Sequence, residues 1–426
     1  MVKQPFHGSS ACQSAEVIFM RTKNPKLLLF SAGENQIGIA RLPKPLQQAG
    51  FSVAALCPPD HYLAQTRFLQ KHYSLPGNRH LWLPTLLYAI QSWSPDLIIP
   101  ADYGTVTYLQ QLATDSGLLT PVPAPVRKLL KKSLGNAKYY EVLQNPRRLF
   151  DLLTMLDIQT PLTCLITSRQ QAFVMAAQIG YPVMLKKGNG FSDSYLHICQ
   201  NEAELTTAYE SLVAAASADS GTLTDSVKRM FANQNIPGIY ALYLQQWQWG
   251  IPAMHAFVAL NGVKLAGITA VKEYTHPQPA GMATVVRFII HEEIADNTNA
   301  LLHKIGYTGF GCFDFTIEPR TNQAFLVDAY PYPSHISHLG GRLGNDLCGA
   351  LLAKLTGAEK QPSTGLPSEN IIALFPHEFN RDAQSAYLQE YYHDVPWDDA
   401  LLLQACPTAS GLVPVASSLP AMVSDE

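Results

Sequence analysis

The chain has 426 residues, a length that corresponds to about three domains. Hydrophobic residues make up 47%, which supports packed cores and excludes a largely disordered protein. The net charge is −3, so no basic excess indicates nucleic acid or an anionic membrane as a partner. No apolar run reaches about 18 residues, the chain start lacks a secretory apolar segment, and the seven cysteines are scattered. We therefore expect a cytoplasmic protein without a membrane-spanning helix.

Short apolar strands alternate with helices over residues 25–125. Three segments are predicted strands: Lys26–Phe30, Val53–Leu56 and Asp96–Pro100. A helix is predicted from the turn after Phe30 to about Ala49, where Gly50 ends it. This alternation predicts a parallel α/β sheet. Asp102 follows the third strand, at the edge where such sheets bind ligands, and it could equally cap a helix or a turn.

A second unit begins near Pro121 with a basic helical stretch, which is typical of a solvated face. Farther on, strand Pro182–Lys187, a Gly/Asn/Ser loop and strand Tyr195–Ile198 form a predicted hairpin. Lys186 lies beside the loop, whose backbone N–H groups could bind phosphate together with the lysine. On this interpretation the charge of Lys186 is matched by phosphate and not by a protein partner. An ordinary turn beside an exposed lysine is the alternative.

Residues 311–330 contain two alternating runs on either side of a turn, which predicts another hairpin. The register with the best apolar matches pairs Phe313 with Ala329, Phe315 with Val327, and Ile317 with Phe325. It places Asp314 opposite Asp328 on the other face, where like charges destabilise a sheet. A divalent cation such as magnesium would neutralise the pair. A solvated face or a shared proton are the alternatives.

These segments occur in the order typical of the ATP-grasp superfamily. The chain resembles in particular the carbamoyl-phosphate-synthetase-like ATP-grasp proteins, over residues 25–356 and most specifically over 180–350. The resemblance implies α/β and α+β structure: a parallel α/β pre-ATP-grasp domain (25–125) and a two-lobed ATP-grasp domain (126–356, mobile lobe about 162–243). A small C-terminal extension (357–406) and a disordered tail (407–426) are predicted to follow.

The resemblance also assigns roles to residues. GYPVMLKKGNG (180–190) resembles the phosphate-binding strand with its flap, and YLQQWQWG (243–250) resembles the adenine hinge. The nucleotide-binding residues that follow from this are Lys186, Arg148, Gly188, Gly190, Ser192, Gln245, Gln246 and Trp247. GYTGFGCFDF and FLVDAYP resemble the magnesium hairpin, with Asp314 and Asp328 as ligands. Arg287 and Lys272, on neighbouring strands, resemble groups that stabilise the transferred phosphate, although either could be a surface charge.

The chain departs from the family at the second magnesium strand. Where the family has Glu-x-Asn-Pro-Arg, this sequence has Asp-Ala-Tyr-Pro-Tyr over 328–332, so Tyr330 and Tyr332 replace the asparagine and the arginine. A neutral phenol is a poor ligand for magnesium. His335, His338 and Arg342 follow closely and could contact an anion.

The resemblance implies a ligase that uses ATP and Mg²⁺. Such an enzyme activates a small carboxylate as an acylphosphate for attack by an amine-type nucleophile, and a homo-oligomer is compatible with it. The alternative is a degenerate ATP-grasp protein that binds a nucleotide or a partner without turnover. A carboxylase that uses bicarbonate is a third interpretation, which the absence of a biotin-carrier Met-Lys-Met stretch weakens.

Overall fold

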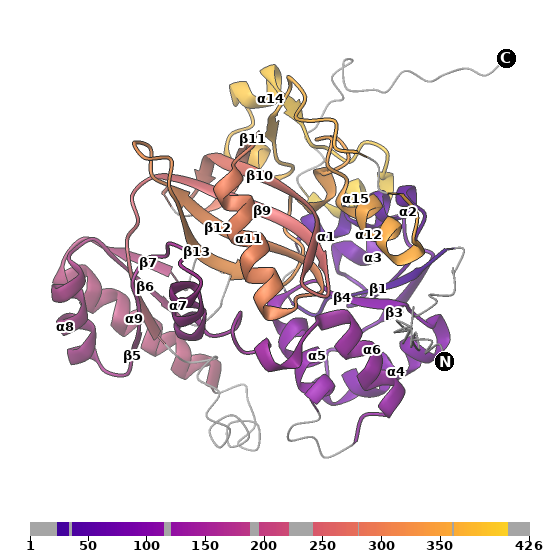
Figure 1. Cartoon of the computed structure of the whole chain (residues 1–426), viewed down its shortest axis with the longest axis horizontal. Helices are drawn as coiled ribbons and strands as arrows, with labels where there is room; N and C mark the ends of the chain where they lie inside the picture. Colours follow the sequence, from indigo (N-terminus) through magenta and orange to yellow (C-terminus); the bar gives the residue numbers. More distant parts are fainter. Residues whose placement is uncertain are drawn as a thin grey trace, which may run out of the picture.

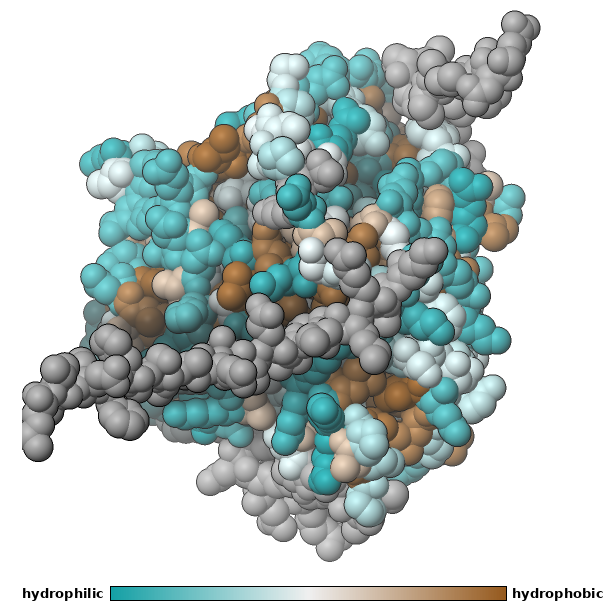
Figure 2. Space-filling model, turned by 45° about the vertical axis from the view of Figure 1, so that its right-hand side comes forward, coloured by the Kyte–Doolittle hydropathy of each residue, from teal (hydrophilic) through white to brown (hydrophobic). Residues whose placement is uncertain are grey.

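The computed structural model describes residues 24–33, 36–114, 121–187, 196–220, 242–279, 281–359 and 362–407. Within them, the N-terminal domain and a small four-stranded lobe lie on opposite sides of a large central sheet (Figure 1). Hydrophilic side chains cover most of the face seen in Figure 2, with hydrophobic ones gathered in a few places. No helix of the described ranges is long and apolar enough to cross a membrane.

The N-terminal domain contains the predicted parallel sheet. Its strands pair in the order β3-β2-β1-β4. They are β1 (Lys26–Phe30), β2 (Ser52–Cys57), β3 (Lys71–Ser74) and β4 (Leu97–Pro100). The helices are α1 (Ile37–Ala40), α2 (Pro43–Ala49), α3 (Tyr62–Gln65), α4 (Trp82–Trp93) and α5 (Tyr103–Thr114), with η1 (Arg79–Leu81) before α4. The single helix predicted before Gly50 is wrong. Two short helices occur because Pro43 has no N–H group to continue the first one.

Two helices and a 3₁₀ turn lead into the small lobe: α6 (Ala124–Leu134), η2 (Ala137–Tyr139) and α7 (Pro146–Met155). The lobe has the antiparallel strand order β5-β8-β6-β7. Its elements are β5 (Thr163–Ile166), α8 (Arg169–Ile179), β6 (Val183–Lys187), β7 (Leu196–Cys199), α9 (Glu202–Ser220) and β8 (Leu242–Gln246). The predicted flap over 188–194 lies outside the described residues.

The large sheet has seven strands in the order β13-β12-β9-β10-β11-β14-β15. Its main strands are β9 (Ile251–Leu260), β10 (Val263–His276), β11 (Met282–Ile289), β12 (Gly309–Ile317) and β13 (Ala324–Tyr330). Helix α11 (Glu292–Ile305) packs on one face together with α7. The other face packs against α12 (Leu347–Thr356) and against the N-terminal domain, and η4 (Ser337–Leu339) leads towards α12. One core thus joins the large sheet to the N-terminal domain.

The C-terminal extension continues the large sheet. It consists of β14 (Ile371–Ala373), α13 (His377–Arg381), α14 (Ala386–Glu390), β15 (Tyr392–His393) and α15 (Ala400–Ala405). Strand β14 pairs antiparallel with β11, and β15 pairs parallel with β14. Asp394, after β15, accepts hydrogen bonds from Arg41 of the N-terminal domain, and Asp399 accepts one from Thr66. The extension is therefore fastened to both of the units that precede it.

The hairpin of β12 and β13 has the predicted register only at its open end. Phe313 lies opposite Ala329 and Asp314 lies opposite Asp328, as predicted. Nearer the turn the prediction is wrong: Phe315 lies opposite Leu326, and Ile317 lies opposite Ala324. The cause is a β-bulge next to the aspartates, which adds one residue to β13 and shifts the later pairs by one position.

Candidate functional site

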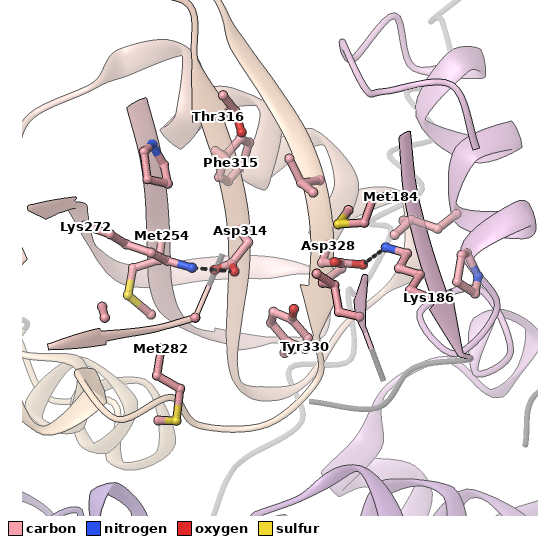
Figure 3. A pocket seen from close by; sticks show the side chains of 18 of the residues that line it. Met184, Lys186, Met254, Lys272, Met282, Asp314, Phe315, Thr316, Asp328 and Tyr330 are labelled. Atoms are coloured by element: carbon pink, nitrogen blue, oxygen red, sulfur yellow. Dashed lines mark hydrogen bonds and ion pairs between the residues drawn. The ribbon is translucent and has the colours of Figure 1, made fainter. Parts of the chain in front are cut away.

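A cavity lies where the small lobe, the large sheet and the N-terminal domain meet. The small lobe and the hinge after it contribute Met184, Lys186, Leu196 and Trp247. The segment around α7 adds Leu143, Pro146 and Leu149, and the N-terminal domain adds Tyr103. The large sheet adds its charged residues Lys272, Asp314 and Asp328 (Figure 3). Five of the residues predicted for the site therefore line one cavity: Lys186, Trp247, Lys272, Asp314 and Asp328.

The four charged side chains form two ion pairs, each of which joins one aspartate of the hairpin to a lysine from another strand. Lys272 Nζ lies 2.7 Å from Asp314 Oδ2, and Lys186 Nζ lies 2.8 Å from Asp328 Oδ1 (Figure 3). The sequence predicts a divalent cation as the source of the positive charge that neutralises the two opposed carboxylates. In this structure two lysines from different strands supply that charge. The expectation that Lys186 lacks a protein partner is wrong, because its side chain is buried and bonded to Asp328.

Burial and charge act against one another in the Asp314–Lys272 pair. Burial raises the pKa of the Asp314 carboxyl, and Lys272 only partly opposes that rise. Burial by itself lowers the pKa of Lys272, but the adjacent Asp314 carboxylate outweighs it and the pKa is raised. Lys272 is therefore a cation at neutral pH, and it lies largely buried beside a carboxylate whose ionisation depends on it.

Gln245 fixes the position of Lys186. Its Oε1 accepts a hydrogen bond from Lys186 Nζ at 3.3 Å, and its Nε2 donates to Thr163 Oγ1 at 2.9 Å. Side chains alternate along a strand, so Gln246 points the other way and is exposed. Of the three hinge residues predicted to bind a nucleotide, Trp247 lines the cavity, Gln245 bonds to Lys186, and Gln246 points away.

Two predicted arginines do not line the cavity. Arg287 lies opposite Val271, the neighbour of Lys272, so it belongs to the other face of the sheet and pairs with Glu273. Arg148 pairs with Glu141 at the surface. Gly188, Gly190 and Ser192 lie outside the described residues. Roles for these five residues stay predictions.

Tyr330 and His335 also line the cavity. Burial, with the charges of Asp328 and Asp314 next, raises the pKa of Tyr330 well above its usual value, so the phenol is neutral. His335 Nε2 is buried and has no hydrogen-bond partner among the residues that the structure describes. Burial, with His377 next, lowers the pKa of His335 to about 3, so this ring is neutral too. Of the other two residues that follow the hairpin, His338 contacts Asp394 and Arg342 contacts Glu369.

The apolar lining around α7 has no signal in the sequence, because the position of a helix against a neighbouring lobe is not visible in the pattern of that helix. Sequence reasoning also missed Tyr103, although it lies three residues after a strand of the parallel sheet, at the edge where such sheets bind ligands.

Asp102 has the structural role given as one alternative. It accepts hydrogen bonds from the backbone N–H groups of Ala32 and Gly33 and from Thr105 N at the start of α5. Ser31 Oγ donates to the same carboxylate and lies 3.1 Å from His61 Nε2. His61 Nδ1 accepts from Leu63 N, so Nε2 carries the proton and donates to Ser31. His61 therefore cannot take a proton from this serine, and the group is not a catalytic triad.

Two lobes and an adjoining parallel α/β domain enclose a site that contains two lysines and two carboxylates. This combination of fold and site defines a class of protein. No family model and no curated protein matches the sequence. Solved structures do match. N5-carboxyaminoimidazole synthetase from Staphylococcus aureus has a TM-score of 0.55 at 13% identity, covering 82% of each chain.

Two further matches have the same architecture. The biotin carboxylase domain of 2-oxoglutarate carboxylase from Hydrogenobacter thermophilus, in complex with MgADP, ADP and bicarbonate, has a TM-score of 0.57 at 15% identity, covering 82% of this chain and 74% of that one. Carboxyaminoimidazole ribonucleotide synthase from Aspergillus clavatus, complexed with ATP, has a TM-score of 0.56 at 11% identity, covering 81% and 79%. The chain has the ATP-grasp fold, as its sequence predicted.

Proposed function

We propose that the protein is an ATP-dependent ligase. It activates a small carboxylate as an acylphosphate, which an amine-type nucleophile then attacks. The observation that carries this proposal is the group of Lys186, Lys272, Asp314 and Asp328 in the cavity between the lobes. The match to structures solved with ATP and with MgADP supports it.

The residues fit one magnesium ion that arrives with the nucleotide. Asp314 and Asp328 lie directly opposite on neighbouring strands and offer hard oxygen ligands. In the described part of the chain no group of three or more His, Cys, Asp or Glu side chains forms a metal cage. Magnesium often binds through one or two carboxylates and takes its other ligands from phosphates and water, so two suffice. When bound, the ion would neutralise charge on the β- and γ-phosphates.

The lysines would stabilise the transferred phosphate. Lys186, positioned by Gln245, would bind phosphate oxygens, and Lys272 would bind oxygens of the γ-phosphate or of the attacking carboxylate. A carboxylate oxygen attacks the γ-phosphorus and ADP leaves. The amine nitrogen then attacks the acyl carbon, phosphate leaves, and the nitrogen loses a proton. Arg287, predicted to share this role, pairs with Glu273 away from the cavity, so we assign the charge stabilisation to the lysines first.

The second candidate is a protein that binds a nucleotide without turnover. The observation that favours it is Tyr330, a neutral phenol where the related proteins were expected to have a third metal ligand. The complete set of four charged residues favours the enzyme.

We further propose that the protein is cytoplasmic, since the six described cysteines are free and buried. We also propose that it acts on small molecules. A homo-oligomer stays part of the proposal, because the biotin carboxylase domain was solved as a dimer.

Phosphate release from ATP, measured against a library of amino acids and small carboxylates, tests the proposed function. We expect one acid, with or without an amine, to raise the rate, and the Asp314→Asn and Asp328→Asn variants to lose that increase. ATP binding without release for any acid would favour the second candidate, and no ATP binding would contradict both.

A further inference from the structure

Side chains with little polarity line the cavity near Lys272. On this side Met254 of β9 and Met282 of β11 lie near Lys272, whereas Met184 lies near Lys186 (Figure 3). Pro279, Tyr330 and His335 also line the cavity. We call the group of Met254, Pro279, Met282, Tyr330 and His335 the substrate end.

The substrate end adds no charge to the cavity. Among the described residues that line it, the charged ones are Lys186, Lys272, Asp314 and Asp328. Methionine and proline are apolar, and the tyrosine and histidine side chains bring no fixed charge. Binding of a phosphate or a second carboxylate normally requires arginine, lysine or a set of free N–H donors. Neither arginine nor lysine belongs to the substrate end in the described ranges.

One polar atom at this end has no partner. His335 Nε2 is buried and makes no hydrogen bond to another described residue. Gly38 of α1 packs against the His335 backbone so closely that a Cβ at residue 38 would lie 2.6 Å from His335 Cα. The ring contacts His377, with 6.0 Å between the ring centres. A buried nitrogen without a hydrogen bond lowers the stability of the fold. We therefore expect a hydrogen-bonding group of a ligand to pair with His335 Nε2.

We propose that the substrate end binds a monocarboxylate with an uncharged, mainly apolar body. Its carboxylate faces Lys272, its apolar part packs against Met254 and Met282, and a hydroxyl or N–H group bonds to His335 Nε2. This inference rests on the proposed function for the place of the nucleotide, and it deepens it by naming the substrate class. It also separates this chain from the Aspergillus synthase solved with ADP and a ribonucleotide, a ligand that carries phosphate.

The first test uses wild-type protein and four acids, without ATP. Calorimetry compares hexanoate and 3-phenylpropionate with adipate and 3-phosphoglycerate. Adipate has the same chain length as hexanoate and one more carboxylate. We expect the two apolar acids to bind at least about tenfold more tightly, as burial of one apolar side group predicts. Equal or tighter binding of adipate or 3-phosphoglycerate would overturn the proposal.

A matched pair of variants tests the position of the site. Met282→Arg places a permanent cation at the substrate end, whereas Met155→Arg places one at the end of α7, where Met155 is 75% exposed. We expect Met282→Arg to weaken hexanoate binding and to strengthen adipate binding, each by about tenfold, with no change in Met155→Arg. Unchanged preference in folded Met282→Arg would contradict the placement of the substrate end.

His335→Phe keeps the ring and removes both nitrogens. In wild type we expect 3-phenyllactate, which has a hydroxyl beside its carboxylate, to bind more tightly than 3-phenylpropionate by about tenfold, the value of one hydrogen bond to a buried group. The variant should lose this difference and keep its affinity for 3-phenylpropionate. If the difference in affinity persists in the variant, His335 does not form a hydrogen bond to the ligand.

These binding measurements are independent of turnover. Apolar acids that bind without stimulating phosphate release would leave the inference standing and contradict the proposed ligase. Phosphate release stimulated only by dicarboxylic or phosphorylated acids would support the ligase and overturn the inference.

Discussion

Lys186 is the residue on which the proposed nucleotide site depends most directly. Its ammonium is buried, and Asp328 and Gln245 hold it at the cavity. Lys186→Met keeps the apolar stem but removes the charge. We expect ATP affinity to fall by about tenfold to a hundredfold, the usual range for a hydrogen bond to a charged group. Calorimetric titration with ATP and magnesium measures it.

Lys132→Met is the matched control, because Lys132 is exposed on α6 and away from the cavity lining. If the ATP affinity of Lys132→Met and that of Lys186→Met both equalled the wild-type value, the phosphates would bind elsewhere.

Asp314 and Lys272 form a coupled pair, and a double-mutant cycle should reveal the coupling. Asp314→Asn leaves a buried ammonium without its carboxylate, and Lys272→Met leaves a buried carboxylate beside Asp328. We expect each single change to lower the free energy of unfolding by about 2–4 kcal/mol, and the double change to cost less than the sum. Urea unfolding of the four proteins checks this. Strictly additive effects would mean that the two side chains do not interact in solution.

At the scale of elements, one buried carboxylate fastens the C-terminal extension. Asp394 accepts hydrogen bonds from Arg41 Nη2 at 2.8 Å and from His338 Nε2 at 2.8 Å. Burial acts to raise the pKa of Asp394, but Arg41 and then His338 outweigh it, so the pKa lies well below its usual range. Burial lowers the pKa of His338, which is therefore a neutral donor.

Asp394→Asn should destabilise the protein by about 3 kcal/mol, because it leaves the Arg41 guanidinium without a charged partner. The sign of the pH dependence follows from the lowered pKa. The stabilisation is complete above the unfolded value of about 4 and is lost as the pH falls below it. Unfolding free energies of wild type and variant should thus differ by a constant amount above about pH 5 and converge in acid. Asp398→Asn, which breaks an exposed pair with Lys44, is the control and should change little.

Elements whose signal is local could be predicted from the sequence. The strands that end in Phe30 and Pro100, the helix capped by Ser168 and ended by Gly180, and the facing aspartates all have such signals. The β-bulge could not be predicted, because both registers pair apolar side chains near the turn. The structural reason for the shift is outside the hairpin, where the N–H of Leu326 bonds to Gln159 O.

Pairing of charges across distant strands was equally invisible. Nothing in the order of residues shows that Lys272 faces Asp314 while Arg287, expected in the same role, belongs to the opposite face. Both strands carry a cation among apolar residues. The two bulges between Lys272 and Thr275 offset one another. Lys272 therefore lies opposite Val286, and Arg287 lies opposite Val271 on the other face.

For the whole molecule, the nucleotide should act as a link between lobes. The cavity is lined from the small lobe, the large sheet and the N-terminal domain, so a ligand there contacts all three. We expect ATP with magnesium to raise the melting temperature, because a ligand at about 100 times its Kd adds about 2.7 kcal/mol to the folded state. Thermal melting with and without magnesium checks this, with the Asp314→Asn/Asp328→Asn protein losing the magnesium dependence. An unchanged melting temperature at millimolar ATP would count against the nucleotide site.

Strand β14 has a consequence for solubility. It occupies the outer hydrogen-bonding groups of β11 over Val285–Arg287, and the sheet then ends in β15, which is only two residues long. A chain cut after Gly357 would expose those groups and would remove the buried Ile372 and Phe375 from their apolar clusters. Unpaired strand edges of this kind recruit other chains. We expect the shortened chain to aggregate, with sheet-rich oligomers in size-exclusion chromatography where the full chain elutes as a defined species. The extension thereby protects the large sheet from self-association.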